Sequence, residues 1–157
     1  MSEYEDSLQR QAQQYVARAP LNLGDTRELL VLSAATCCYA AHDYFTSRLG
    51  DPVLIDHLLA TIRDADGFFS GDARIQAAHY LRSGDSLLLQ ARSEELLAIY
   101  DAEDGEGAGG CLRPLLALSL SRGRIHGGRE RVARDVDPGR YNNGLFEDAL
   151  REYDQLA

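Results

Sequence analysis

Arginine residues crowd one segment of the sequence, between positions 122 and 140, and glycines separate several of them. Guanidinium groups and exposed backbone N–H groups are the donors with which proteins hold phosphate or carboxylate. The Arg-rich loop at about 122–140 is therefore predicted to bind an anion or an acidic partner. The predicted binding residues are Arg122, Arg124, Arg129, Arg131 and Arg134. Two other interpretations are that these arginines neutralise the chain's own acidic surface, or that they meet the acidic loop of a second copy.

Acidic residues precede this segment. The glycine-rich stretch at about 101–110 is predicted to be an acidic loop, because glycine there frees the backbone. Together with the carboxylates before it, this loop is predicted to form a face for a basic partner. The residues of this acidic face are Glu94, Glu95, Asp101, Glu103, Asp104 and Glu106.

Arg74 and His79 are separated by four residues, and Tyr80 follows. This spacing resembles the Arg-x4-6-His pattern of the HEPN ribonucleases, an all-α family of about this size. The resemblance implies that the Arg/His pair would cleave RNA, usually across a dimer. The chain departs from the family pattern at Ile75, where a polar residue is usual. The alternative interpretation of the segment is an amphipathic surface helix.

Cys38 and His42 are four residues apart, so they share one face of a helix. With a third ligand, a pair of this kind can hold Zn²⁺. A buried cysteine in a tight helix crossing is the alternative, and no repeated Cys-x2-Cys spacing supports a metal. We therefore expect no metal and no cofactor. Lysine is absent from the chain, which excludes Schiff-base chemistry.

The composition and net charge of the chain exclude some classes of binding partner. The chain has 157 residues, a formal charge of −9 and an isoelectric point near 4.8. Duplex nucleic acid and acidic membranes repel such a chain. The most apolar run, residues 29–41, is too short to cross a bilayer, and the start of the chain is acidic where a secretory signal is basic. Three cysteines, two of them adjacent, do not form a disulfide framework, so we expect a cytoplasmic protein.

Apolar residues recur throughout with a period near 3.6, and no segment alternates as a strand would. The predicted fold is all-α, one helical domain over residues 1–157. Six or seven helices would surround a buried central helix at about 25–48, because residues 29–41 are apolar or small on every face.

No catalytic constellation emerges from these patterns, so the sequence favours a binding protein over an enzyme. We expect a small acidic protein that binds another macromolecule, such as an adaptor, an inhibitor, an antitoxin or immunity-like protein, or a subunit of an assembly. A homo-oligomer is compatible with this expectation. The alternatives are a HEPN-like ribonuclease using Arg74 and His79, or a small helical enzyme that holds an anionic ligand through the arginines at 122–134.

Overall fold

The structure is a computed structural model that describes residues 2–35, 37–64, 72–103 and 111–155. Within these ranges it contains ten α-helices and no strand, which confirms the all-α prediction. The contacts divide the chain into two compact units, Met1–Tyr80 and Leu81–Ala157. The prediction that the whole chain acts as one domain stays a prediction.

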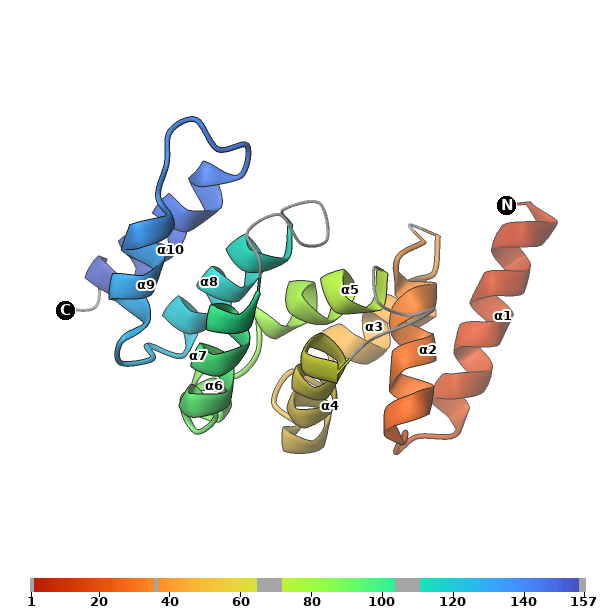
Figure 1. The fold of residues 1–157 in the computed structure, drawn as a ribbon. Coiled ribbons are helices and arrows are strands. Elements are labelled where there is room, and N and C mark those ends of the chain that lie inside the picture. Colours follow the sequence, from red (N-terminus) through yellow and green to blue (C-terminus); the bar gives the residue numbers. More distant parts are fainter. Residues whose placement is uncertain (1, 36, 65–71, 104–110, 156–157) are drawn as a thin grey trace. The chain divides into compact units, whose positions relative to one another are not determined.

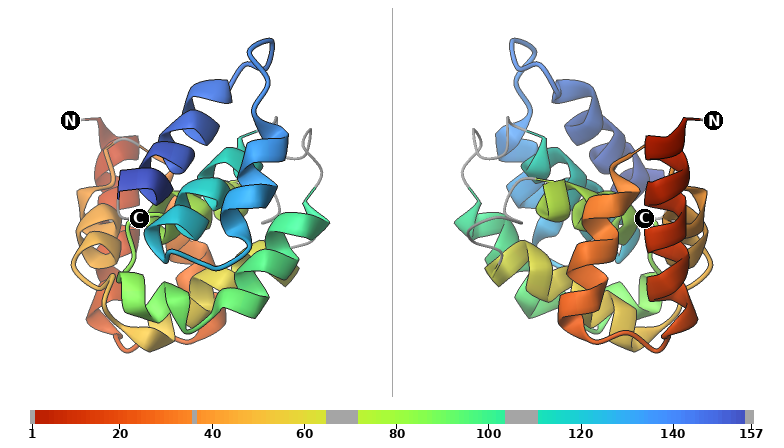
Figure 2. Two further views of the ribbon diagram at one scale, coloured as in Figure 1. Left: turned by 90° about the vertical axis from the view of Figure 1, so that its left-hand side faces the viewer. Right: turned by 90° about the vertical axis from the view of Figure 1, so that its right-hand side faces the viewer.

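The N-terminal unit holds the first five helices (Figure 1). They are α1 (Glu3–Ala17), α2 (Leu23–Ser33), α3 (Tyr39–Thr46), α4 (Pro52–Asp64) and α5 (Asp72–Leu81), whose last residue already belongs to the second unit. Helix α3 packs against both α1 and α2, and α2 also packs against α4. Figure 2 shows α1 and α2 side by side. Fully buried side chains from α2, α3 and α4, among them Leu29, Phe45 and Ile55, form the core of this unit.

The predicted central helix at 25–48 is wrong as a single helix, because the structure divides it into α2 and α3. Helix α2 begins at Leu23, where the Asn22 side chain accepts a hydrogen bond from the backbone N–H of Asp25. It ends at Ser33, whose hydroxyl donates to the Leu30 carbonyl. The following backbone bonds, from Ala34 to Val31 and from Ala35 to Leu32, join residues three apart and tighten the last turn. Both halves still bury apolar side chains, as predicted for this segment.

The C-terminal unit holds the other five helices. They are α6 (Ser86–Gln90), α7 (Ser93–Ala102), α8 (Leu112–Arg122), α9 (Gly128–Asp135) and α10 (Asn143–Gln155). Helix α8 packs against each of the other four and is buried on most of its surface, including Leu116 and Ala117. Figure 2 shows α10 beside α8 and α9, against which it buries Phe146 and Ala149. In this unit the surrounded helix is therefore α8.

No helix within the described ranges is both long and apolar enough to span a membrane.

Candidate functional site

Most of the predicted anion-binding arginines already have partners inside the C-terminal unit. Arg129 donates to both carboxylate oxygens of Asp154, at 2.7 and 3.0 Å. Arg131 pairs with Asp101 at 2.8 Å, and Arg122 Nε donates to the Gly84 carbonyl at 3.0 Å. The remaining two, Arg124 and Arg134, are exposed, and their guanidinium groups contact no described acceptor. An anion site in this segment stays a prediction. Arg124 and Arg134 are the two predicted residues whose guanidinium groups could bind an anion without first breaking a described contact.

The glycines beside these arginines serve packing and chain reversal. Gly127 has a φ of +86°, in the left-handed region that favours glycine. Gly128 is buried where α9 begins, and a Cβ there would collide with the Tyr153 hydroxyl and approach Leu120 Cβ to 3.3 Å. That hydroxyl is held in place because it donates to the Ile125 carbonyl at 3.1 Å. These two positions therefore need glycine for backbone geometry and close approach, without any bound anion.

Asp135, at the end of α9, collects three side chains into what we call the Asp135 cluster. It accepts hydrogen bonds from the Tyr100 hydroxyl and from Arg113 Nε, the second at 2.9 Å, and it forms an ion pair with Arg140 at 3.7 Å. Arg113 also donates to the Glu103 carbonyl, and its guanidinium lies 4.4 Å from the centre of the Tyr100 ring. Burial, followed by the hydrogen bond and negative charge of Asp135, raises the pKa of Tyr100. The cluster is thus a closed, mutually paired network.

Only some of the residues of the predicted acidic face are exposed, and one of these is paired with another side chain. Glu94 is exposed and Glu95 half-buried, both in the first turn of α7. Asp101 is paired with Arg131. Glu103 is a correction, because it is only 8% exposed beside the guanidinium of Arg113, which its carbonyl binds. Asp104 and Glu106 lie outside the described residues.

The structure does not bring Arg74 and His79 together on one face. Both lie on α5, and five residues of α-helix turn the chain through about 500°, which leaves the two side chains about 140° apart around the axis. Arg74 is half-buried, and its Nε donates to the Ile62 carbonyl at the end of α4. The His79 ring lies edge-on to the Tyr80 ring. RNA cleavage by this pair stays a prediction that the arrangement does not favour.

Cys38 and His42 each make a hydrogen bond to a different group and not to one another. The buried Cys38 thiol donates to the Leu8 carbonyl at 3.7 Å, and burial raises its pKa. His42 Nδ1 is 2.8 Å from the Tyr80 hydroxyl. Within the described part of the chain, no three His, Cys, Asp or Glu side chains are placed to hold a metal ion.

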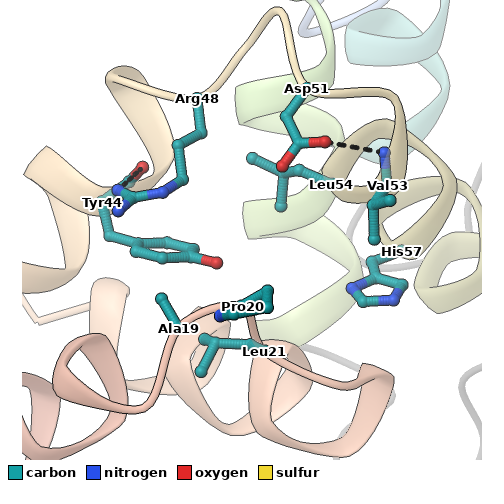
Figure 3. Close-up of a pocket in the computed structure, with 9 residues that line it drawn as sticks. All are labelled: Ala19, Pro20, Leu21, Tyr44, Arg48, Asp51, Val53, Leu54 and His57. Carbon is teal, nitrogen blue, oxygen red and sulfur yellow. Dashed lines mark hydrogen bonds between the residues drawn. The ribbon is translucent and has the colours of Figure 1, made fainter.

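The N-terminal unit contains a cavity of about 300 Å³, the Tyr44–His57 cavity, that the sequence patterns did not indicate (Figure 3). Polar and charged groups on its wall come from the end of α3 and the start of α4, while the loop before α2 supplies apolar side chains. The lining residues are Ala19, Pro20, Leu21, Tyr44, Arg48, Asp51, Val53, Leu54 and His57. A mostly apolar hollow with a few convergent polar groups is the usual form of a small-ligand site.

Tyr44 is the unusual member of this wall. It is only 6% exposed, and its hydroxyl makes no hydrogen bond with any described residue. Figure 3 shows this hydroxyl pointing into the cavity. The Arg48 guanidinium lies over the ring, 4.1 Å from its centre, and donates to the Tyr44 carbonyl and the Ser47 hydroxyl. Burial raises the pKa of Tyr44, so the hydroxyl keeps its proton at neutral pH.

Asp51 lies on the wall above that hydroxyl. One carboxylate oxygen accepts the backbone N–H of Val53 at 3.0 Å and so caps the start of α4. The other oxygen is turned toward the cavity (Figure 3).

His57 lies on the opposite wall of the cavity, and its ring contacts Thr26. The Thr26 hydroxyl lies 2.9 Å from the Asn22 carbonyl and 3.0 Å from His57 Nδ1. This hydroxyl has one proton and two acceptors within reach, so either neutral tautomer of His57 fits the contact. Burial lowers the pKa of His57, so the ring is neutral at pH 7.

A second hollow of about 370 Å³, the α1–α3 groove, lies between α1 and α3 and shares Tyr44 and Arg48 with the cavity. Apolar side chains from both helices line it, with Asp43 and Gln13 among its polar members. The lining residues are Gln13, Val16, Ala17, Ala40, Asp43, Tyr44, Ser47 and Arg48. It is the more open of the two hollows.

Comparison of this chain with protein-family models, with curated proteins and with solved structures finds no match in any of the three. Its function is therefore inferred from its own geometry.

Proposed function

We propose that this protein works by binding a basic protein partner, and that the contact surface is the α1–α3 groove with the residues around it. The observation that carries the proposal is this apolar groove between two helices, with an exposed tyrosine and an exposed carboxylate on α3 beside it. Such a surface fits an amphipathic helix whose apolar face enters the groove and whose basic residues meet the acidic rim.

Exposed aromatic residues lie on the two helices that form the groove. Tyr4, on α1, and Tyr39, at the start of α3, are 73% and 58% exposed. The start of α3 adjoins the middle of α1, because Cys38 binds the Leu8 carbonyl and the Ala40 N–H donates to the Gln9 side chain at 3.2 Å. Tyrosines are enriched among the residues that contribute most to protein interfaces.

Charge supports a basic partner. Residues 1–80 contain 6 arginines and 11 acidic residues, a net charge of −5. Glu3, Glu5 and Asp6 occupy the first turn of α1, and Asp43 is exposed on α3. The net negative charge of this unit, with Asp43 in the groove lining, speeds the encounter with a cationic partner and disfavours acidic ones. Three cysteines with two adjacent fit a reducing compartment, and we place the interaction in the cytoplasm.

The test is native mass spectrometry of the protein purified gently from its own host, on three forms. They are the natural chain, the double variant Tyr39→Ser/Asp43→Lys, and Glu94→Lys, which reverses one exposed carboxylate on the acidic face in the other unit. We expect a heteromeric mass with a basic partner for the natural chain and for Glu94→Lys. The double variant should bind the purified partner at least about tenfold more weakly, since an interface tyrosine and a complementary charge are both lost.

Each other result decides against part of the proposal. Loss of the partner in Glu94→Lys, with retention in the double variant, would move the contact to the acidic face of α7. Equal binding by all three forms would exclude both surfaces. A mass corresponding to the chain alone, or to copies of it, would overturn the proposal of a basic partner protein.

A further inference from the structure

The Tyr44–His57 cavity carries an inference beyond the proposed partner surface, with which it shares Tyr44 and Arg48. We propose that it binds a small primary amine in its ammonium form, with the hydrocarbon part of the amine against the apolar wall. Two acceptors face the cavity, the second carboxylate oxygen of Asp51 and the hydroxyl oxygen of Tyr44, and His57 also lines it. A primary ammonium has three N–H donors, so it can donate to both acceptors and to water.

The Tyr44 hydroxyl is the strongest single observation. The Tyr44 side chain is 94% buried, but its hydroxyl oxygen is open to the hollow and makes no hydrogen bond to a described residue (Figure 3). Its partner is therefore water or a ligand in the cavity. The hydroxyl oxygen accepts from an ammonium, and the hydroxyl proton is left for Asp51 or for water.

The charges around the cavity favour a cation over an anion. Asp51 supplies a negative charge at the wall. The nearest cation is Arg48, whose guanidinium lies over the face of the Tyr44 ring and is hydrogen-bonded to the Tyr44 carbonyl and Ser47. These bonds hold the guanidinium against the Tyr44 ring, although Arg48 also lines the cavity. An ammonium therefore gains the Asp51 carboxylate, whereas a carboxylate ligand would meet it unfavourably.

The apolar wall of the cavity determines the size and character of the part of the ligand that carries the ammonium. Leu21, Leu54 and Pro20 face the hollow from two segments of the unit. A cavity of about 300 Å³ accommodates a short alkyl chain or a small ring beside the ammonium. The ligand class is thus a small alkylamine, and a free amino acid fits less well because its carboxylate would lie near Asp51.

Isothermal titration with n-butylammonium tests the proposal, with n-butanol and butyrate as probes of equal chain length and different charge. We expect butylammonium to bind at least about tenfold more tightly than either, because only it donates to the charged Asp51 oxygen. Equal binding of butanol would show an apolar hollow without an ammonium site. Tighter binding of butyrate would assign the cavity to anions through Arg48. Either result overturns the proposal, as does an absence of butylammonium binding at millimolar concentration.

Two variants and one matched control locate the site. Asp51→Asn keeps a side chain that caps α4 but removes the charge, and should weaken butylammonium binding about tenfold. Tyr44→Phe keeps the ring beneath Arg48 and should weaken binding about threefold to tenfold. Asp56→Asn removes the same charge from an exposed position of α4 outside the cavity lining, and should change binding less than about twofold. An equal loss in Asp51→Asn and Asp56→Asn would mean that only the overall negative charge attracts the amine, and would overturn the assignment.

Discussion

The two units of this chain treat their buried polar groups in opposite ways. In the C-terminal unit, the Tyr100 hydroxyl donates to Asp135, which also binds Arg113 and Arg140. In the N-terminal unit, the Tyr44 side chain is buried, but its hydroxyl is open to a cavity and has no described partner. Both tyrosines lie beneath an arginine, at 4.4 and 4.1 Å, so their local surroundings are otherwise alike.

This difference shows where a binding site is to be sought in a strongly charged protein. The C-terminal unit has the denser arginines, but several of them bind carboxylates or carbonyls of the same unit, as Arg129 and Arg131 do. Paired groups of this kind hold the fold. A polar atom that opens onto a hollow and that the fold leaves unpaired takes its partner from outside, either water or a ligand. Pairing, more than the density of charge, therefore separates the structural cluster from the candidate site.

The largest effect is expected from Asp135→Ala. This change leaves Arg113, whose side chain is only 20% exposed, without its carboxylate, and also removes the partner of the Tyr100 hydroxyl. We expect the free energy of unfolding to fall by about 2–4 kcal/mol, measured by urea denaturation. Asp148→Ala is the control, because Asp148 forms an exposed pair with Arg151 and its loss should cost at most about 0.5 kcal/mol. Similar small losses in both variants would mean that the Asp135 cluster does not stabilise the fold.

A matched pair of tyrosine variants tests the comparison directly. Tyr100→Phe removes a hydroxyl that donates to a carboxylate, and should lower the free energy of unfolding by about 1–3 kcal/mol. Tyr44→Phe removes a hydroxyl without a described protein partner, and should change stability by less than about 0.5 kcal/mol. Both are measured by urea denaturation in the absence of any amine. The reverse ranking would show that the fold depends on the cavity hydroxyl, and would end the contrast between the two units.

Much of the helical architecture follows from local pattern. Apolar residues recur at a helical period over residues 2–19, and α1 spans Glu3–Ala17. The break between α2 and α3 escaped prediction, because residues 29–41 are apolar on every face and contain neither proline nor glycine. Backbone bonds to residues three back and the contact of Cys38 with α1 settle that turn, and neither is visible in the apolar period.

The sites were less predictable, because pairing depends on residues far apart in sequence. Arg131 and Asp101 are 30 positions apart, and nothing in either segment shows that they meet. The interpretation that the arginines neutralise the chain's own acids was open from the sequence, and it describes Arg129 and Arg131 well. The Tyr44–His57 cavity draws on two helices and the loop before α2. The Asp51-Pro52 pair in its wall is typical of a helix start, because proline fits the first helical position, and does not indicate a ligand.

The smallest expected effect is a shift in the pKa of His57. Burial lowers the pKa of this ring and Arg27 lowers it further, while the Asp51 and Asp56 carboxylates raise it by less. We expect an NMR titration of the ring to give a midpoint below about 6.5, the ordinary value for histidine. Asp56→Asn, which removes one of the opposing carboxylates, should lower the midpoint further.

The sign of the stability effect follows from the same shift. As pH falls below about 6.5, the unfolded chain binds the proton before the folded chain does, so the contribution of neutral His57 to stability is complete above that pH and is lost as pH falls through the folded pKa. Bound butylammonium should lower the midpoint again, because a cationic ring on the wall of the same cavity would repel the ammonium. A midpoint above about 6.5 would mean that the carboxylates outweigh burial and that a cationic ring faces the cavity. Such a ring would repel an amine, and the contrast between a paired C-terminal unit and a cation-accepting N-terminal unit would fail at His57.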